Sequence, residues 1–385
     1  VAILIAIDSP STVHPHAHKM RILAIGTAEH VDRHPAAPSA ARIEAPDCIA
    51  LPGLVNAHTH LDLTHIGPQP HDPGEGFVAW VDRIRAARRA DDAEIADSVR
   101  AGAELLLRGG TVAVGDIGGA PHGRPSLAPW RSLRDTPLQG VSYLEFFAIG
   151  TREEAALARV DAARAQASSE YPDEWQQPVD AGLRGVRLGL QPHATNTVSP
   201  RAYRWARRRA GELGLPLATH LAETIEEQEF IARGTGPLRE FGRGRHPIDH
   251  FLDGLQDAAG QGIAAIEPRF VLAHVNDLGD GEMADRRIER LARAGVSVAY
   301  CPRASAYFAA PQHFGAHRWS DMLAAGVNVC LGTDSIVNLP AGTGSAAGPL
   351  GDRGISTLDE MRMLLDRDGG AAREVLAMGT TRGAR

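Results

Sequence analysis

Residues 51–62 read Leu-Pro-Gly-Leu-Val-Asn-Ala-His-Thr-His-Leu-Asp, a short apolar run that ends in two histidines separated by one residue. Side chains alternate between the two faces of a strand, so His58 and His60 would point to the same side. Two imidazoles placed in this way can bind one metal ion. A single His-x-His pair is a weak signal, because surface strands often carry two histidines. The interpretation therefore depends on the rest of the chain.

After residue 50 the chain repeats one pattern, in which a short apolar run and a loop precede an Ala/Arg/Glu-rich segment of helical periodicity. Such alternation predicts a parallel sheet covered by helices. We predict eight strands over residues 53–57, 111–116, 140–147, 186–191, 216–221, 270–274, 296–301 and 327–332. We predict helices over residues 91–108, 152–168, 200–213, 281–294, 319–325 and 371–378. Eight strand–helix units are the number that closes a (β/α)8 barrel, the TIM-barrel fold.

Residues 1–50 differ, with β-rich runs over 1–7, 21–25 and 42–50 that are separated by turns rich in His, Pro and Ala. No helical periodicity is visible there, and residues 30–41 and 341–354 are predicted as loops. We therefore predict two domains, a small β module in residues 1–50 and the barrel in residues 51–385. Because the chain stops in a helix soon after the last predicted strand, we expect trimmed ends and a β-sandwich that lacks its C-terminal part.

Composition limits the classes of partner. The 385 residues are 43% hydrophobic and 23% charged, close to the globular average. A net charge of −7 argues against binding to nucleic acid or an anionic membrane and favours a small-molecule substrate. Three widely spaced cysteines without a Cys-x-x-Cys pair fit a reducing compartment, and the apolar start VAILIAI is too short to span a bilayer. We expect a cytoplasmic protein, with a homodimer as the default assembly.

Three further predicted strands end in side chains that can bind metal. His220, His274 and Asp334 close the segments LATH, VLAH and LGTD. In such barrels the catalytic residues lie at the carboxyl ends of the strands, where the loops converge. One buried histidine is more often a core residue than a ligand. Recurrence at successive strand ends instead predicts one shared metal site.

Taken together, these segments resemble the amidohydrolase superfamily, and in particular its aminohydrolase branch of deaminases and chlorohydrolases. The resemblance runs from about residue 49 to residue 385 and rests on LPGLVNAHTHLD, PHATNTVS, THLAET, VLAHVNDL, YCPR and LGTDS, in that order. It implies that the metal ligands are His58, His60, His220 and Asp334. It also implies that Glu223, His274 and Asp334 are catalytic, with His274 and Asp334 helping to deprotonate the attacking water and Glu223 protonating a ring nitrogen. The alternative for Glu223 is a carboxylate that stabilises a helix N-terminus.

Three neutral imidazoles and one carboxylate leave a coordination position open for water, as a catalytic site requires. Zinc is the conventional choice for this set, although iron(II) or manganese(II) also accepts such nitrogen and oxygen donors. Binuclear members of the superfamily often bridge two ions with a carboxylated lysine from the barrel. This sequence has no lysine after Lys19, so we predict one divalent ion unless Glu145 takes the bridging role.

Four residues are candidates for substrate contacts. The resemblance makes His193 a contact at the end of the fourth strand, and relatives carry a Phe-x-x-Trp segment over the pocket at the place of Phe77 and Trp80. The alternative is that Phe77 and Trp80, which have helical spacing, pack in the core. Arg303 is a candidate partner for a carboxylate on the substrate, with a structural salt bridge as the alternative. Thr195-Asn196 replaces a Pro-Tyr pair that is common in relatives, so the pocket differs locally.

The HTHLDL start, the Phe-x-x-Trp segment and the Ala-Tyr-Phe sequence after YCPR most resemble aminodeoxyfutalosine deaminases of menaquinone biosynthesis. The implied reaction is hydrolytic deamination of the adenine ring of a purine nucleoside. Alternative substrates are S-adenosylhomocysteine, methylthioadenosine, guanine or another aminated heterocycle. A catalytically silent barrel that binds a metabolite is the alternative from another class.

Overall fold

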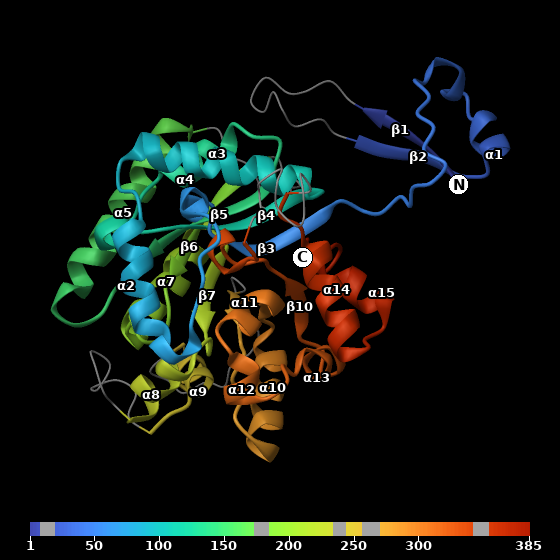
Figure 1. Cartoon of the computed structure of the whole chain (residues 1–385). Helices are drawn as coiled ribbons and strands as arrows, with labels where there is room; N and C mark the ends of the chain where they lie inside the picture. Colours follow the sequence, from blue (N-terminus) through green and yellow to red (C-terminus); the bar gives the residue numbers. More distant parts are fainter. Residues whose placement is uncertain (8–19, 173–184, 234–243, 256–269, 342–353) are drawn as a thin grey trace.

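The computed structural model describes residues 1–7, 20–172, 185–233, 244–255, 270–341 and 354–385. Eight parallel strands follow one another in chain order around a barrel (Figure 1). They are β3 (Leu54–Thr59), β4 (Thr111–Gly118), β5 (Gln139–Phe146), β6 (Val186–Pro192), β7 (Leu217–Leu221), β8 (Phe270–His274), β9 (Ser297–Tyr300) and β10 (Asn328–Leu331). All eight strands predicted from the sequence are confirmed, and the chain has the (β/α)8 fold.

Strands β3 and β10 meet through a short set of contacts that close the barrel. Thr59 and Asp334 form a parallel bridge, and the backbone N–H groups of Thr333 and Asp334 donate to the His58 carbonyl at 3.1 and 3.0 Å. The Asn56 side chain adds a hydrogen bond of 2.7 Å from its Nδ2 to Thr333 Oγ1. Closure thus brings the first and last strands of the barrel together at the level of His58 and Asp334.

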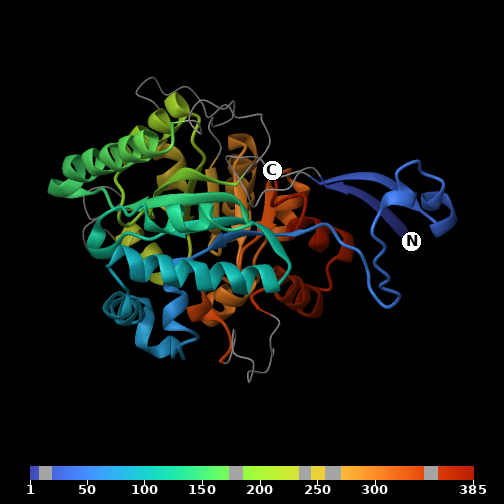
Figure 2. The ribbon, with the colours of Figure 1, turned by 90° about the horizontal axis from the view of Figure 1, so that it is seen from above.

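Helices surround the strands in both views (Figures 1 and 2). They are α2 (Gly76–Ala87), α3 (Asp92–Arg108), α4 (Ala128–Arg134), α5 (Glu153–Glu170), α7 (Pro200–Leu213), α8 (Ile225–Arg233), α9 (Pro247–Gly254), α10 (Gly281–Ala294), α11 (Pro302–Tyr307), α12 (Ala310–Phe314), α13 (Trp319–Ala324), α14 (Thr357–Asp368) and α15 (Ala372–Met378). Short 3₁₀ helices include η2 (Leu61–Ile66) and η7 (Ile336–Asn338). The six predicted helices are confirmed to within two residues at each end.

Local sequence explains where these helices begin and end. The Asp91 side chain accepts hydrogen bonds from the N–H groups of Ala93 and Glu94 at the start of α3, and Ser199 caps α7 in the same way. Helix α7 ends at Gly214, which has a left-handed φ of 63° that glycine adopts without strain. Within the part of the chain that the structure describes, no helix is long and apolar enough to cross a membrane.

The N-terminal segment forms an antiparallel pair, β1 (Ala2–Ile7) and β2 (Met20–Gly26), beside the barrel (Figure 2). Among the residues that the structure describes, the expected sandwich is represented by this two-stranded sheet alone. The prediction of a strand-rich run over 42–50 was wrong, because no described strand pairs with it, and Ile43 and Ile49 are 91% and 85% exposed. The division into domains at residue 50 stays a prediction.

The prediction of a loop over 30–41 was also wrong, since helix α1 (Ala28–Asp32) and η1 (Ala37–Ser39) fall within or overlap it. Thr27 caps α1 by accepting a hydrogen bond of 3.2 Å from the His30 N–H. The loop predicted over 341–354 lies almost entirely outside the described residues.

Candidate metal centre and catalytic residues

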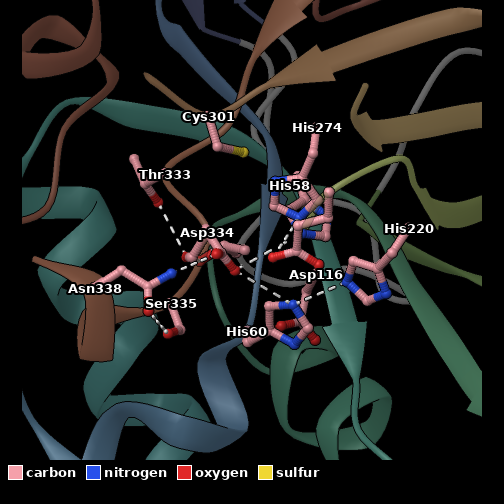
Figure 3. Close-up of polar contacts among 12 residues, drawn as sticks. His58, His60, Asp116, His220, His274, Cys301, Thr333, Asp334, Ser335 and Asn338 are labelled. Atoms are coloured by element: carbon pink, nitrogen blue, oxygen red, sulfur yellow. Dashed lines mark hydrogen bonds and ion pairs between the residues drawn. The ribbon is translucent and has the colours of Figure 1, made fainter. Parts of the chain in front are cut away.

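Strand ends place the predicted ligands around one point at the mouth of the barrel (Figure 3). His58 lies in β3 and His60 follows that strand, while His220 belongs to β7 and Asp334 follows β10. His58 and Asp334 are 1% and 6% exposed, so the centre is buried. His58 within β3 and His60 one residue after its end both face this centre, as the sequence predicted.

The ligand atoms of these residues converge. Asp334 Oδ1 lies 3.5 Å from His60 Nε2 and 3.8 Å from His58 Nε2, and His220 Nε2 lies 3.3 Å from His60 Nε2. His58, His60 and Asp334 each offer one such atom within 4.8 Å of the others, as do His58, His220 and His274. The structure thus brings together the four residues that the sequence singled out as ligands.

The histidines are in the neutral state that allows an imidazole to bind a cation. His58 Nε2 is buried without a hydrogen-bond partner, which is uncommon for a polar atom unless something else binds it. Burial, together with the neighbouring imidazoles, lowers the pKa of His58 and His60 well below the usual value, and burial lowers the pKa of His220 to about 3. His220 Nδ1 lies 3.1 Å from the His193 carbonyl, to which it can donate while Nε2 keeps its lone pair. Neutral imidazoles and one carboxylate are therefore available to hold a divalent ion.

Asp334 is held by a residue that the sequence analysis missed. Asn338, in η7, donates a hydrogen bond from Nδ2 to Asp334 Oδ2, which leaves Oδ1 facing the histidines. Asp334 has a φ of 56°, in the left-handed region that non-glycine residues rarely adopt. Burial raises the pKa of Asp334 to about 7. The backbone turn and Asn338 thus fix one carboxylate oxygen toward the centre.

A second pair of side chains adjoins Asp334. Glu223 Oε1 lies 3.5 Å from His274 Nε2, and both residues offer a ligand atom within 4.8 Å of Asp334. Burial, followed by the charge of Asp334, raises the pKa of Glu223 well above its usual range, while burial lowers that of His274. His317, also absent from the predicted site, lies with Nε2 3.0 Å from the His274 carbonyl. A carboxyl and an imidazole suited to proton transfer are thus next to the ligand set.

His193 lies beside the metal centre and is the most accessible of these histidines, with 28% of its side chain exposed. Its Nδ1 lies 2.7 Å from Thr197 Oγ1, and its Nε2 lies 3.9 Å from Glu145 Oε1. The Arg88 guanidinium lies 3.9 Å from the other oxygen of Glu145. Glu145, His193 and His220 each offer a ligand atom within 4.8 Å of the others, so the bridging role of Glu145 stays an open alternative. Substrate contact by His193 stays a prediction.

Arg303 is engaged elsewhere. Its side chain is 12% exposed and forms a salt bridge with Glu360 of α14, which has no exposed surface. The Arg303 backbone N–H also donates to Glu360 at 2.9 Å. This is the structural salt bridge that the sequence left open as the alternative, so the expectation of a substrate contact is not supported by the geometry.

Phe77 and Trp80 belong to an aromatic cluster between α2 and α11. Their rings stack with centroids 5.5 Å apart, and Phe308 meets both edge to face. Trp80 is buried in the core and donates from Nε1 to the Tyr307 hydroxyl at 3.1 Å. Trp80 therefore packs in the core, which was the alternative interpretation of its sequence pattern. A role as a lid over the substrate stays a prediction.

Comparison with known proteins agrees with this site. The profile of the amidohydrolase family matches residues 49–385. The aminodeoxyfutalosine deaminase of Deinococcus radiodurans is 32% identical over 78% of this chain and 67% of its own length. The 5-methylthioadenosine/S-adenosylhomocysteine deaminase of Nitratidesulfovibrio vulgaris is 29% identical over 82% of this chain and 62% of its own. The chain thus spans about two thirds of the length of these curated relatives.

Solved structures share the fold at low sequence identity. A zinc complex of the atrazine chlorohydrolase of Arthrobacter aurescens has a TM-score of 0.63 at 20% identity, covering 99% of this chain and 77% of that one. The aminofutalosine deaminase of Helicobacter pylori has a TM-score of 0.60 at 18% identity, covering 98% and 85%. With the family profile matched along nearly the whole barrel, the chain belongs to the amidohydrolase family.

Proposed function

We propose that this chain is a metal-dependent deaminase that hydrolyses the exocyclic amino group from the purine ring of a nucleoside. The observation that carries the proposal is the convergence at one barrel mouth of a ligand set for a cation and of the Glu223–His274 pair beside Asp334. The two curated relatives are deaminases of nucleosides by name, which supports the same class of reaction.

The donor set comprises three neutral imidazoles and one carboxylate, which suits a single divalent ion. We propose zinc, with iron(II) or manganese(II) as the alternatives. When bound, such an ion supplies Lewis-acid activation of a water molecule near neutral pH. The residues that would hold it are His58, His60, His220 and Asp334.

The chain's own groups then move the protons. Asp334, together with His274, would help to remove the proton of the attacking water, while Asn338 holds Oδ2 and leaves Oδ1 facing the ligand set. Burial and the charge of Asp334 raise the pKa of Glu223, which favours the protonated carboxyl that would donate to the ring nitrogen next to the carbon under attack. His274 stays neutral and orients the Glu223 carboxyl through its Nε2. Asp334 would then give its proton to the amino group, which leaves as ammonia, while the proton of the added hydroxyl returns to Glu223 and the water oxygen becomes the carbonyl oxygen of the product.

For the substrate we propose aminodeoxyfutalosine, a purine nucleoside of menaquinone biosynthesis. The relative of that name is 32% identical to this chain, which supports this choice over methylthioadenosine and S-adenosylhomocysteine. His193 is proposed to contact the substrate, and Phe77 and Trp80 are proposed to cover it. The complete ligand set and the Glu223–His274 pair argue against a silent metabolite-binding barrel.

The proposal is tested by measuring ammonia release from a panel of adenine nucleosides and guanine, with metal content determined on the same sample. We expect release from aminodeoxyfutalosine at about one divalent ion per chain. Glu223→Gln should retain the ion but lose about 10²–10⁴-fold in kcat, the usual contribution of general acid–base catalysis. The matched control is Glu282→Gln on α10, whose carboxylate is 88% exposed and should not affect turnover. A metal-loaded protein that releases ammonia from no compound of the panel would refute the proposal.

A further inference from the structure

The short segment between His220 and α8 is held by another barrel loop. The N–H groups of Asn276 and Asp277 both donate to the Ala222 carbonyl, at 2.9 and 3.1 Å. Ala222 has a φ of 52°, a left-handed conformation that is unfavourable for an alanine. The loop after β8 thus holds the backbone immediately before Glu223 in a conformation that it would not favour alone.

Two buried side chains hold the peptide groups of Glu223 itself. Glu227, which is 4% exposed, accepts a hydrogen bond of 2.9 Å on Oε2 from the Glu223 N–H. Asn276, which is 7% exposed, donates from Nδ2 to the Glu223 carbonyl at 3.0 Å. The second oxygen of Glu227 accepts from the hydroxyl of Thr195, a fully buried residue of the loop after β6. Glu227 and Asn276 therefore both hold the backbone of Glu223, and the loop after β6 is linked to it through Glu227.

Helix capping explains only part of this arrangement. Thr224 and Glu227 have the Thr-x-x-Glu spacing of a capping box, and the Glu227 N–H lies 3.4 Å from Thr224 Oγ1. In that motif the glutamate side chain bonds to the N–H of the capping residue, here Thr224. The Glu227 carboxylate instead bonds to the N–H of Glu223 and reaches across to Thr195. A capping role would require neither contact.

We infer that Glu227 and Asn276 form a clamp that positions Glu223 for proton transfer, an inference that rests on the proposed function. The carboxyl of Glu223 must reach both His274 and the bound ring, and a misplacement of about 1 Å at a reacting group can cost about 10²-fold in rate. Glu227 and Asn276 do not touch the reacting atoms, so both are positioning residues. Thr195 orients the Glu227 carboxylate.

The test compares Glu227→Ala, Glu227→Gln and Thr224→Ala in the metal-loaded protein. Glu227→Ala should lower kcat by about 10–100-fold and leave KM and metal content unchanged. Glu227→Gln should recover most of the lost kcat, because its amide oxygen can accept from the Glu223 N–H and its amide nitrogen can donate to Thr195. Thr224→Ala removes the capping contact alone, so it should lower the melting temperature without lowering kcat.

Hydrogen exchange of the backbone over residues 221–226 gives a readout that needs no substrate. We expect faster exchange in Glu227→Ala than in Thr224→Ala, so the clamp can be verified even if the proposed reaction is wrong. Wild-type kcat together with wild-type exchange in Glu227→Ala would overturn the inference, as would a Gln variant as slow as the Ala variant. If Glu227→Ala does not fold, Asn276→Ala tests the clamp from its other side, and wild-type kcat there would likewise overturn it.

Discussion

Substitution of Arg303 by alanine is expected to destabilise the fold rather than to weaken substrate binding. Its guanidinium pairs with the Glu360 carboxylate, which has no exposed surface, and its own side chain is 12% exposed. Removing one partner of a buried ion pair leaves the other charge unmatched, at a cost of about 3–5 kcal/mol. At about 2.1 cal/mol/K per residue, the unfolding entropy of the 385 residues is about 0.8 kcal/mol/K. A loss of about 4 kcal/mol should therefore lower Tm by about 5 °C.

Calorimetry of the metal-loaded protein measures this shift, and steady-state kinetics on the same samples give KM. The matched control is Arg362→Ala on α14, the helix that carries Glu360. The Arg362 side chain is 59% exposed, so its pair with Asp359 should be worth less than about 1 kcal/mol. Adding Glu360→Gln to Arg303→Ala should recover part of the loss, because no buried charge then remains. An unchanged Tm with a tenfold rise in KM would refute this reasoning and make Arg303 a substrate contact.

Three further predictions concern the metal, pH and the aromatic cluster. His58→Ala should lose both the ion and turnover while keeping the circular dichroism spectrum of the wild type. A chelator should abolish the activity of the wild type and added zinc should restore it, whereas added zinc should not activate His58→Ala. Burial lowers the pKa of His317 to about 4, so between pH 4 and 6.5 the unfolded chain binds the extra proton and stability falls as the pH decreases. In His317→Gln, the free energy of unfolding of the metal-free protein, measured with urea, should depend less steeply on pH in this range than in the wild type, by up to about 1.4 kcal/mol per pH unit. An identical slope in the two proteins would contradict the lowered pKa of His317. Trp80→Phe removes the donor to the Tyr307 hydroxyl and should raise KM without changing kcat if the cluster covers the substrate; an unchanged KM would leave Trp80 as core packing alone.

The barrel and the proximity of the candidate ligands could be predicted because both depend on local patterns. Each strand is a short apolar run, and the carboxyl ends of parallel strands meet at one mouth, so donors that follow such runs must lie near one another. The run over 42–50 failed for the opposite reason. A β-prone segment becomes a strand only where a partner supplies its hydrogen bonds, and composition does not contain that information.

Two supporting residues, Asn276 and His317, were missed because they contact backbone atoms of other loops. Asn338 was missed although it contacts the side chain of Asp334 only four residues earlier. Asn338 holds Asp334, Asn276 holds Glu223, and His317 lies against the His274 carbonyl across a separation of 43 residues. Only Glu227 had a local signal, the Thr-x-x-Glu spacing, and that signal predicts a different hydrogen bond from the one present. Such contacts follow from how the loops meet, which the fold determines.

Backbone strain is concentrated around the metal centre in this protein. Of the six described non-glycine residues with positive φ, four lie at or next to the proposed catalytic groups, namely Ala222, His274, Val275 and Asp334. Each such conformation costs of order 1–3 kcal/mol and persists only where surrounding contacts impose it. Those contacts are visible here as hydrogen bonds between neighbouring strand ends, from Asp334 to His58 and from Val275 to Leu221. Because Ala222, Val275 and Asp334 are each hydrogen-bonded to a neighbouring strand end or loop, the barrel can hold proton-transfer groups in positions that their own loops would not maintain, and loosening one loop should disturb its neighbour.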